Sequence, residues 1–154
     1  MSVTGIHEIG DRLLVVFDGN CGFCNRSVRW LLRRDRRDRL RFVGFESAKV
    51  AGLMGRHGIG GSDSESGPNG IAGTMLVVRD ADGPAEKLLV RSDAVVALLR
   101  ELPRPWPWVG LALKWIPRPV RDLGYRLVAR WRYRIRGRLA NCPIPTAEER
   151  ERFL

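Results

Sequence analysis

The sequence predicts an α/β protein whose core is a mixed four-stranded sheet flanked by helices. The first observation is the order of its segments, which runs strand, helix, strand, helix, strand, strand, helix. Strands joined through a helix pair in parallel by a crossover, whereas strands joined by a short turn form an antiparallel hairpin. The second observation is that 154 residues, 44% of them hydrophobic, suffice for one core. We therefore expect a single domain over residues 1–154, with its core at about 12–102 and a C-terminal helical extension at about 103–154.

The first half of the chain alternates between strand-like and helix-like patterns. The run "LLVVF" is apolar and rich in valine, as a buried strand is, and the segment after it places Val28, Leu31 and Leu32 on one helical face. The predicted elements are a strand over Leu13–Phe17, a helix over about Gly22–Arg34, a strand over Leu40–Phe45 and a helix over Glu46–Gly58. Gly58–Gly73 follows with six glycines and three serines, so we expect a functional or disordered loop there.

The second half predicts a hairpin and then helices separated by prolines. The strands of the hairpin are expected over Thr74–Asp80 and Ala85–Arg91, and Ser92 is placed to cap a helix over Asp93–Leu102. Further helices are expected over Trp108–Trp115 and from Pro119 to about Arg136, and Thr146 with Glu149 forms a capping box for a last one. The apolar stripe of the long helix consists of Val120, Leu123, Leu127, Val128, Trp131 and Ile135, and we expect it to pack against the core. The same packing role is expected for the tryptophans Trp106, Trp108, Trp115 and Trp131.

Composition indicates a globular protein of basic charge. The formal net charge is +10, almost all of it from arginine, and such a surface attracts phosphate, RNA and acidic lipid headgroups. Because Asp35 and Asp38 interrupt the first arginine run, and the apolar stripe accounts for the aromatic residues of the second, we expect solvated helix faces rather than a nucleic-acid site. Peripheral membrane contact stays open. The start of the chain shows no signal-peptide pattern and no apolar segment is long enough to span a bilayer, so we expect a cytoplasmic location.

Cys21 and Cys24 lie three positions apart, directly after the first strand and at the start of the first helix. That spacing lets both sulfurs reach one point, either to form a small disulfide or to bind one metal ion. A helix N-terminus favours a thiolate over a thiol, and the thiolate is the nucleophile of disulfide exchange. We therefore expect Cys21 to be the more exposed thiol and the attacking one, and Cys24, one turn deeper, to resolve the mixed disulfide. In a cytoplasmic protein such a pair is more often catalytic or metal-binding than structural.

The segment "FDGNCGFC" resembles the hallmark of the DCC family of thiol-disulfide oxidoreductases, an Asp followed by a Cys-x-x-Cys pair. The matching positions are Asp18, Cys21 and Cys24. The resemblance extends over nearly the whole chain, through "RSDA", "PRPVRDLGY", "RYRIRGR" and "CPIPT". It implies a thioredoxin-like fold, thiol or disulfide substrates of protein or small-molecule kind, and no bound organic cofactor.

One position departs from the wider thioredoxin pattern. Thioredoxins carry a cis-proline before the third strand, facing the cysteines, whereas Gly73 and Thr74 stand there in this sequence. We expect Gly73 and Thr74 to flank the site opposite the cysteines and, with Phe23 between the cysteines, to contact substrate. Asp18 has two compatible interpretations: a general base that takes a proton from Cys24, or a cap for the turn.

Two alternatives compete with a redox enzyme. The first is a soft-metal-binding protein that uses the same cysteines, although a zinc site needs four ligands and only Cys142, His57 and His7 remain to complete one. We accordingly assign no metal ligands, expect both histidines at the surface, and interpret Cys142 as a small buried residue rather than a second resolving thiol. The second alternative is a basic adaptor that contacts nucleic acid or a membrane surface and in which the cysteines are incidental.

Overall fold

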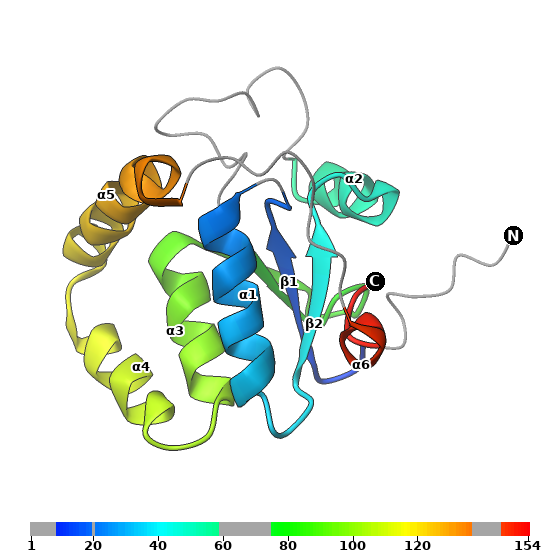
Figure 1. Cartoon of the computed structure of the whole chain (residues 1–154), viewed down its shortest axis with the longest axis horizontal. Coiled ribbons are helices and arrows are strands. Elements are labelled where there is room, and N and C mark those ends of the chain that lie inside the picture. Colours follow the sequence, from blue (N-terminus) through cyan, green and yellow to red (C-terminus); the bar gives the residue numbers. More distant parts are fainter. Residues whose placement is uncertain (1–8, 20, 59–74, 137–145) are drawn as a thin grey trace, which may run out of the picture.

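The computed structural model describes residues 9–19, 21–58, 75–136 and 146–154 (Figure 1). Its sheet has the order β2-β1-β3-β4. β1 pairs in parallel with β2 and antiparallel with β3, and β3 pairs antiparallel with β4. The strands are β1 Leu13–Phe17, β2 Leu40–Gly44, β3 Leu76–Arg79 and β4 Lys87–Val90. The predicted mixed four-stranded sheet, with its parallel crossover and its hairpin, is confirmed.

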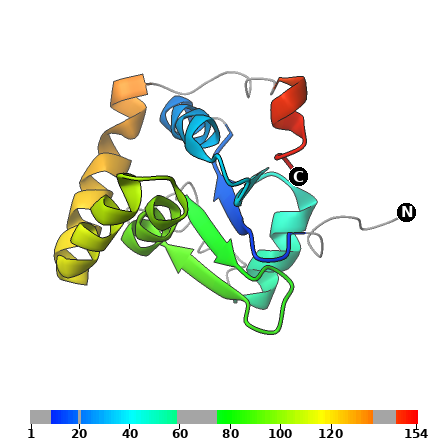
Figure 2. The same cartoon turned by 90° about the horizontal axis from the view of Figure 1, so that it is seen from below.

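Helices cover both faces of this sheet. They are α1 Gly22–Arg34, α2 Ala48–Arg56, α3 Arg91–Glu101, α4 Trp106–Trp115, α5 Arg118–Arg136 and α6 Ala147–Arg150. α1 and α3 lie on one face and α2 on the other, while α4 and α5 form an outer layer beyond α1 and α3 (Figures 1 and 2). The arrangement is thioredoxin-like, with a C-terminal helical extension.

The alternation of side chains along β1 explains why all five of its residues are apolar. Leu13, Val15 and Phe17 point into the core that α1 and α3 close. Leu14 and Val16 point into the second core, which α2 closes. Since successive side chains of a strand face opposite sides, a central strand covered on both sides has no polar position left. Packing on both faces of the sheet therefore holds β1 in place, and with it the end of the strand, from which the chain turns to Cys21.

The C-terminal residues cover the outer edge of β2. The Phe42 N–H donates to the Arg152 carbonyl at 2.8 Å, and the Leu154 N–H donates to the Phe42 carbonyl at 2.8 Å. Phe153 packs edge-on against Phe17, with ring centroids 6.1 Å apart. A strand edge that is paired in this way is protected from pairing with another chain. The capping box predicted from Thr146 and Glu149 is confirmed at the start of α6.

Several predicted boundaries are wrong by one or two residues, and one predicted cap is wrong. α3 begins at Arg91 with Val90 as its N-cap residue, so Ser92 lies inside the helix. The Ser92 hydroxyl instead donates to the Asp122 carboxylate of α5. α4 begins at Trp106 rather than Trp108. Because α3 begins one residue before Ser92, this serine stands within the first turn and not at the cap position.

The expectation that the tryptophans pack in the core is wrong for three of the four. Trp106 packs against Trp30 with ring centroids 4.7 Å apart. Trp108, Trp115 and Trp131 are 62%, 84% and 51% exposed. The apolar stripe of α5 is likewise exposed wherever its side chains are described, at Val120, Leu123, Leu127, Val128 and Trp131. Helical spacing shows which residues share a face, but it does not show whether the protein covers that face.

Candidate active site

Cys21 occupies the turn between β1 and α1. Its N–H donates to the Asp18 carbonyl at 3.2 Å, which closes the turn after the end of β1. The residue has extended backbone geometry and is the N-cap of α1, and its sulfur accepts a hydrogen bond from the Cys24 N–H at 3.3 Å. A sulfur in this position receives one of the unpaired N–H groups of the helix and faces the positive end of its dipole. The Cys21 sulfur therefore lies where the first turn of α1 presents a backbone donor to it.

Cys24 lies one turn further along α1, on the face that packs against the sheet. Both cysteines belong to the core cluster between the sheet and α1, and the structure holds them as thiols rather than as a disulfide. The exposed fraction is 0% for Cys21 and 4% for Cys24. The expectation that Cys21 is the more exposed thiol is therefore wrong, because the turn that follows β1 directs its sulfur inward, back over the first turn of the helix.

Asn25 holds this turn in place, and the sequence analysis did not identify it. Its side-chain amide donates to the Gly19 carbonyl at 2.6 Å and to the Cys21 carbonyl at 3.1 Å. These two bonds join Gly19, in the turn after β1, and Cys21 to the first turn of α1. The available signal was an asparagine in the first turn of a helix, where its amide can reach backbone carbonyls.

Asp18 is half-buried at the end of β1, where its backbone carbonyl accepts the bond from Cys21. Gly73 and Thr74 lie outside the described residues, as do Cys142 and His7. The first described residue of the segment that leads into β3 is Met75, whose N–H donates to the Tyr125 hydroxyl of α5 at 3.3 Å. Tyr125 thus ties the C-terminal extension to the chain next to Gly73 and Thr74, a contact between residues fifty positions apart that no local pattern indicates.

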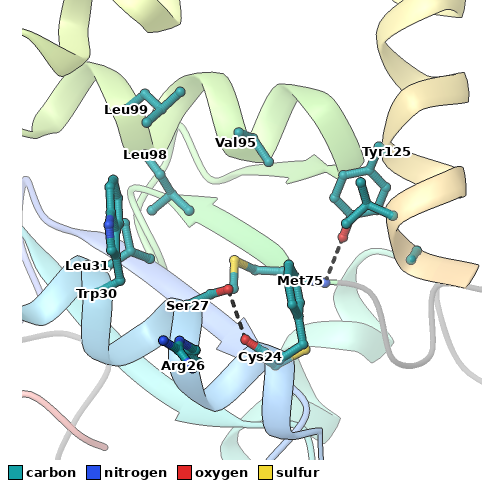
Figure 3. A pocket seen from close by; sticks show the side chains of 13 residues that line it. Cys24, Arg26, Ser27, Trp30, Leu31, Met75, Val95, Leu98, Leu99 and Tyr125 are labelled. Atoms are coloured by element: carbon teal, nitrogen blue, oxygen red, sulfur yellow. Dashed lines mark hydrogen bonds between the residues drawn. The ribbon is translucent and has the colours of Figure 1, made fainter. Parts of the chain in front are cut away.

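An apolar cavity of about 360 Å³ lies beside Cys24, between α1, α3 and α5 (Figure 3). Phe23, Cys24 and Trp30 of α1 line it, and Tyr125 and Ala129 of α5 close it from the other side. The remaining lining residues are Arg26, Ser27, Leu31, Met75, Val95, Leu98, Leu99 and Val128. Of the predicted substrate contacts, Phe23 is therefore the one described residue that lines a cavity next to the cysteine pair. Sequence reasoning missed this cavity because its walls come from three helices far apart in the chain.

The described residues contain no group of three or more His, Cys, Asp or Glu side chains that could hold a metal ion. His57 is partly buried rather than fully exposed, and its Nε2 lies 2.9 Å from the Glu86 carboxylate. Arg56 also binds Glu86 at 3.0 Å, and this hydrogen bond lowers the pKa of the Glu86 carboxyl. Together these contacts tie the end of α2 to the β3–β4 hairpin, away from the cysteines.

The comparison with known families gives the same assignment as the motif. The model of the DCC1-like thiol-disulfide oxidoreductase family matches residues 15–138, which include the end of β1, both cysteines and all of α5. The chain belongs to this family. The resemblance inferred from Asp18, Cys21 and Cys24 is thus confirmed.

Relatives of this DCC1-like chain align over most of its length. It is 27% identical over 147 residues to the uncharacterised protein YuxK of Bacillus subtilis (strain 168), and the alignment covers 96% of each chain. It is 29% identical over 137 residues to a chloroplastic DCC family protein of Arabidopsis thaliana, covering 89% of this chain and 72% of the relative. No solved structure gives a significant match. Within the described residues, no helix is both long enough and apolar enough to cross a bilayer.

Proposed function

We propose that the protein is a dithiol–disulfide oxidoreductase that works through Cys21 and Cys24. The observation that carries the proposal is the hydrogen bond of 3.3 Å from the Cys24 N–H to the Cys21 sulfur at the N-terminus of α1. It places the Cys21 sulfur at the end of α1 that presents unpaired N–H donors, with the second thiol one turn away. Membership of the DCC1-like thiol-disulfide oxidoreductase family supports the same chemistry.

The proposed reaction has two exchange steps. The Cys21 thiolate attacks one sulfur of a substrate disulfide, forms a mixed disulfide and releases the other substrate sulfur as a thiolate. Cys24 then loses its proton and attacks the Cys21 sulfur, which expels the second substrate thiolate and leaves a Cys21–Cys24 disulfide. Two electrons pass from the protein to the substrate, and a thiol reductant returns the protein to its dithiol form. Because Cys21 is buried, we infer that the residues over it move aside when substrate binds.

We assign Asp18 the role of accepting the proton of Cys24 in the second step, on the grounds of its place at the end of β1 and in the family motif. Asp18→Asn keeps the shape and the oxygen that can cap the turn but removes the basic carboxylate. It is expected to slow resolution of the mixed disulfide on the order of a hundredfold and to leave the attack of Cys21 unchanged. Rapid-quench measurement of the two steps across pH checks this. Unchanged resolution in Asp18→Asn would show that Asp18 only caps the turn.

We further propose that the cavity beside Cys24 receives an apolar part of the substrate, with Phe23 as a contact, and that Gly73 and Thr74 also contact the substrate. Ala129→Phe places a ring inside this cavity and is expected to lower kcat/KM for an aromatic disulfide such as dithiodipyridine by about tenfold. Exchange with glutathione disulfide, which lacks such a group, should change little. The matched control is Ala112→Phe, which adds the same ring at an exposed position of α4. Equal effects of the two variants on both substrates would contradict the assignment.

The test of the proposed function is thiol-disulfide exchange with insulin or glutathione disulfide by the full-length protein. Metal analysis of anaerobically purified protein tests the competing assignment, and stoichiometric zinc bound by Cys21 and Cys24 would favour it. We also propose a cytoplasmic location. One relative is described as chloroplastic, so membership of the family does not by itself determine the location.

A further inference from the structure

The exposed large apolar side chains of the described residues are concentrated in one region. They are Trp108, Val109, Leu111, Trp115, Ile116, Val120, Leu123, Leu127, Val128 and Trp131. All belong to α4, α5 and the link between these helices, which together form the outer layer of the molecule (Figure 1). We call this set the outer apolar face. A concentration of this kind on a surface marks a site of interaction, whereas scattered exposed apolar residues do not.

α5 directs most of its described apolar stripe away from the protein, and Val128, at the border of the stripe, also lines the cavity beside Cys24. The side chains that attach it to the rest of the molecule are polar or small: the Tyr125 hydroxyl accepts from Met75, Asp122 accepts from Ser92, and Arg121 pairs with Asp93 at 2.9 Å. The exposed residues Val120, Leu123, Leu127 and Trp131 recur at intervals of three or four, which places them on the opposite side of the helix. Among the described residues, nothing covers this apolar side of α5.

α4 is oriented in the same way. Gly110 is buried against α3, where an added Cβ would lie 3.2 Å from Leu99 Cβ, so glycine allows the close approach of the two helices. The exposed Trp108, Leu111 and Trp115 recur at intervals of three and four on the other side of α4. The outer apolar face therefore continues from one helix to the next.

Positive charge surrounds this face. Residues 103–136 contain eight arginines and one lysine but only one acidic residue, Asp122, which points inward to Ser92. Arg126, Arg130 and Arg134 are exposed on α5 beside Leu127 and Trp131, and the Arg134 guanidinium lies 5.6 Å from the Trp131 ring centroid. Apolar and tryptophan side chains bordered by arginines are the pattern of helices that lie in the interface of an anionic membrane.

We propose that the outer apolar face binds the protein peripherally to membranes that contain anionic lipids. The arginines that surround the face favour an anionic membrane over a second copy of the chain or RNA. Two copies packed face to face would bring their arginines together, and RNA offers bases to stack on tryptophan but nothing that covers Val120, Leu123 or Leu127. Since neither helix is long and apolar enough to span a bilayer, they would lie in its surface, with Trp108, Trp115 and Trp131 at headgroup depth.

The test is co-sedimentation of the full-length protein with phosphatidylglycerol vesicles and with phosphatidylcholine vesicles. Wild-type protein is expected to bind the former, with an affinity that falls as salt rises. The triple variant Arg126→Gln, Arg130→Gln, Arg134→Gln should weaken this binding on the order of a hundredfold. The triple variant Trp108→Ser, Leu127→Ser, Trp131→Ser should weaken it at least about tenfold. All six positions are exposed, so both variants should fold, which circular dichroism and thermal melting check.

The matched control is Arg36→Gln, Arg37→Gln, Arg79→Gln, which removes the same charge from exposed positions outside α4 and α5. It should retain most of the vesicle binding. If it lost as much binding as the Arg126, Arg130, Arg134 variant, net charge alone would explain the binding, and the proposal would be overturned. Absence of wild-type binding to phosphatidylglycerol vesicles would also overturn it. Two other results would overturn it as well. One is a dimer, detected by light scattering, that the Trp108, Leu127, Trp131 variant no longer forms; the other is binding to RNA in preference to these vesicles.

Discussion

Cys21→Ser is expected to abolish disulfide exchange, whereas Cys24→Ser is expected to stop the reaction after its first step. Cys21 is the thiol at the N-cap of α1, and a serine hydroxyl there is not a nucleophile toward disulfides. Loss of the attacking thiol should lower the rate about a thousandfold or more. Cys24→Ser retains the attacking thiol but lacks the resolving one, so it should accumulate a mixed disulfide with substrate. The measurement is exchange with insulin or glutathione disulfide, followed by mass spectrometry of the trapped species.

The third cysteine provides a matched control, because Cys142→Ser removes a thiol outside the Cys-x-x-Cys pair. We expect this variant to exchange disulfides at the wild-type rate. Equal activity in wild type, Cys21→Ser and Cys24→Ser would refute the redox function altogether. A mixed disulfide trapped by Cys21→Ser instead of Cys24→Ser would reverse the roles of the two thiols, a result that the greater burial of Cys21 makes worth measuring.

Asp35→Ala is expected to lower the free energy of unfolding by about 3 kcal/mol. The Asp35 side chain is 0% exposed. Its carboxylate accepts bonds from the N–H groups of Arg39 and Leu40, both at 3.0 Å, and Arg152 of the C-terminal segment donates to it at 3.4 Å. Alanine would leave the two backbone donors without their acceptor at the place where the chain passes from α1 to β2. Since domains of this size are stable by roughly 5–15 kcal/mol, this is a large fraction of the total.

Urea denaturation checks this expectation through the midpoint and the slope of the transition. The matched control is Asp11→Ala, because the Asp11 side chain is 97% exposed and its ion pair with Arg39 is as long as 4.0 Å. It should change the free energy of unfolding by less than about 0.5 kcal/mol. A similar small change in Asp35→Ala would show that the buried carboxylate is not what joins α1, β2 and the C-terminal segment.

The parts of the fold that local patterns determine were predicted well. The apolar run of β1, the turn residues of the β3–β4 hairpin and the apolar positions of α1 give the sheet, its mixed pairing and its covering helices. The orientation of α4 and α5 was not predicted. The spacing of apolar residues shows which side chains share one face of a helix, but it does not show whether that face is buried or exposed. What fixes these helices is long-range: Ser92 to Asp122, Met75 to Tyr125 and Gly110 against Leu99.

The candidate site divides in the same way. Strand, turn and helix N-terminus are adjacent in sequence, so the position of Cys21 and Cys24 could be predicted from "FDGNCGFC". The burial of the two cysteines could not be predicted. It depends on how the turn directs the Cys21 sulfur and on which side chains of α3 and α5 pack around α1. The cavity beside Cys24 needs Val95 and Leu98 of α3 together with Tyr125 and Ala129 of α5, residues about 70 to 105 positions away.

We propose that Cys21 and Cys24 form one reversible redox couple. The direct measurement is equilibration of the full-length protein in glutathione buffers of graded redox potential, followed by alkylation and peptide mass spectrometry. We predict a Cys21–Cys24 disulfide that forms in the oxidising buffers and returns to two alkylated thiols in the reducing ones, with Cys142 alkylated throughout. Two cysteines that stay reduced at every potential, or that bond only to glutathione or to Cys142, would show that Cys21 and Cys24 are not a redox couple.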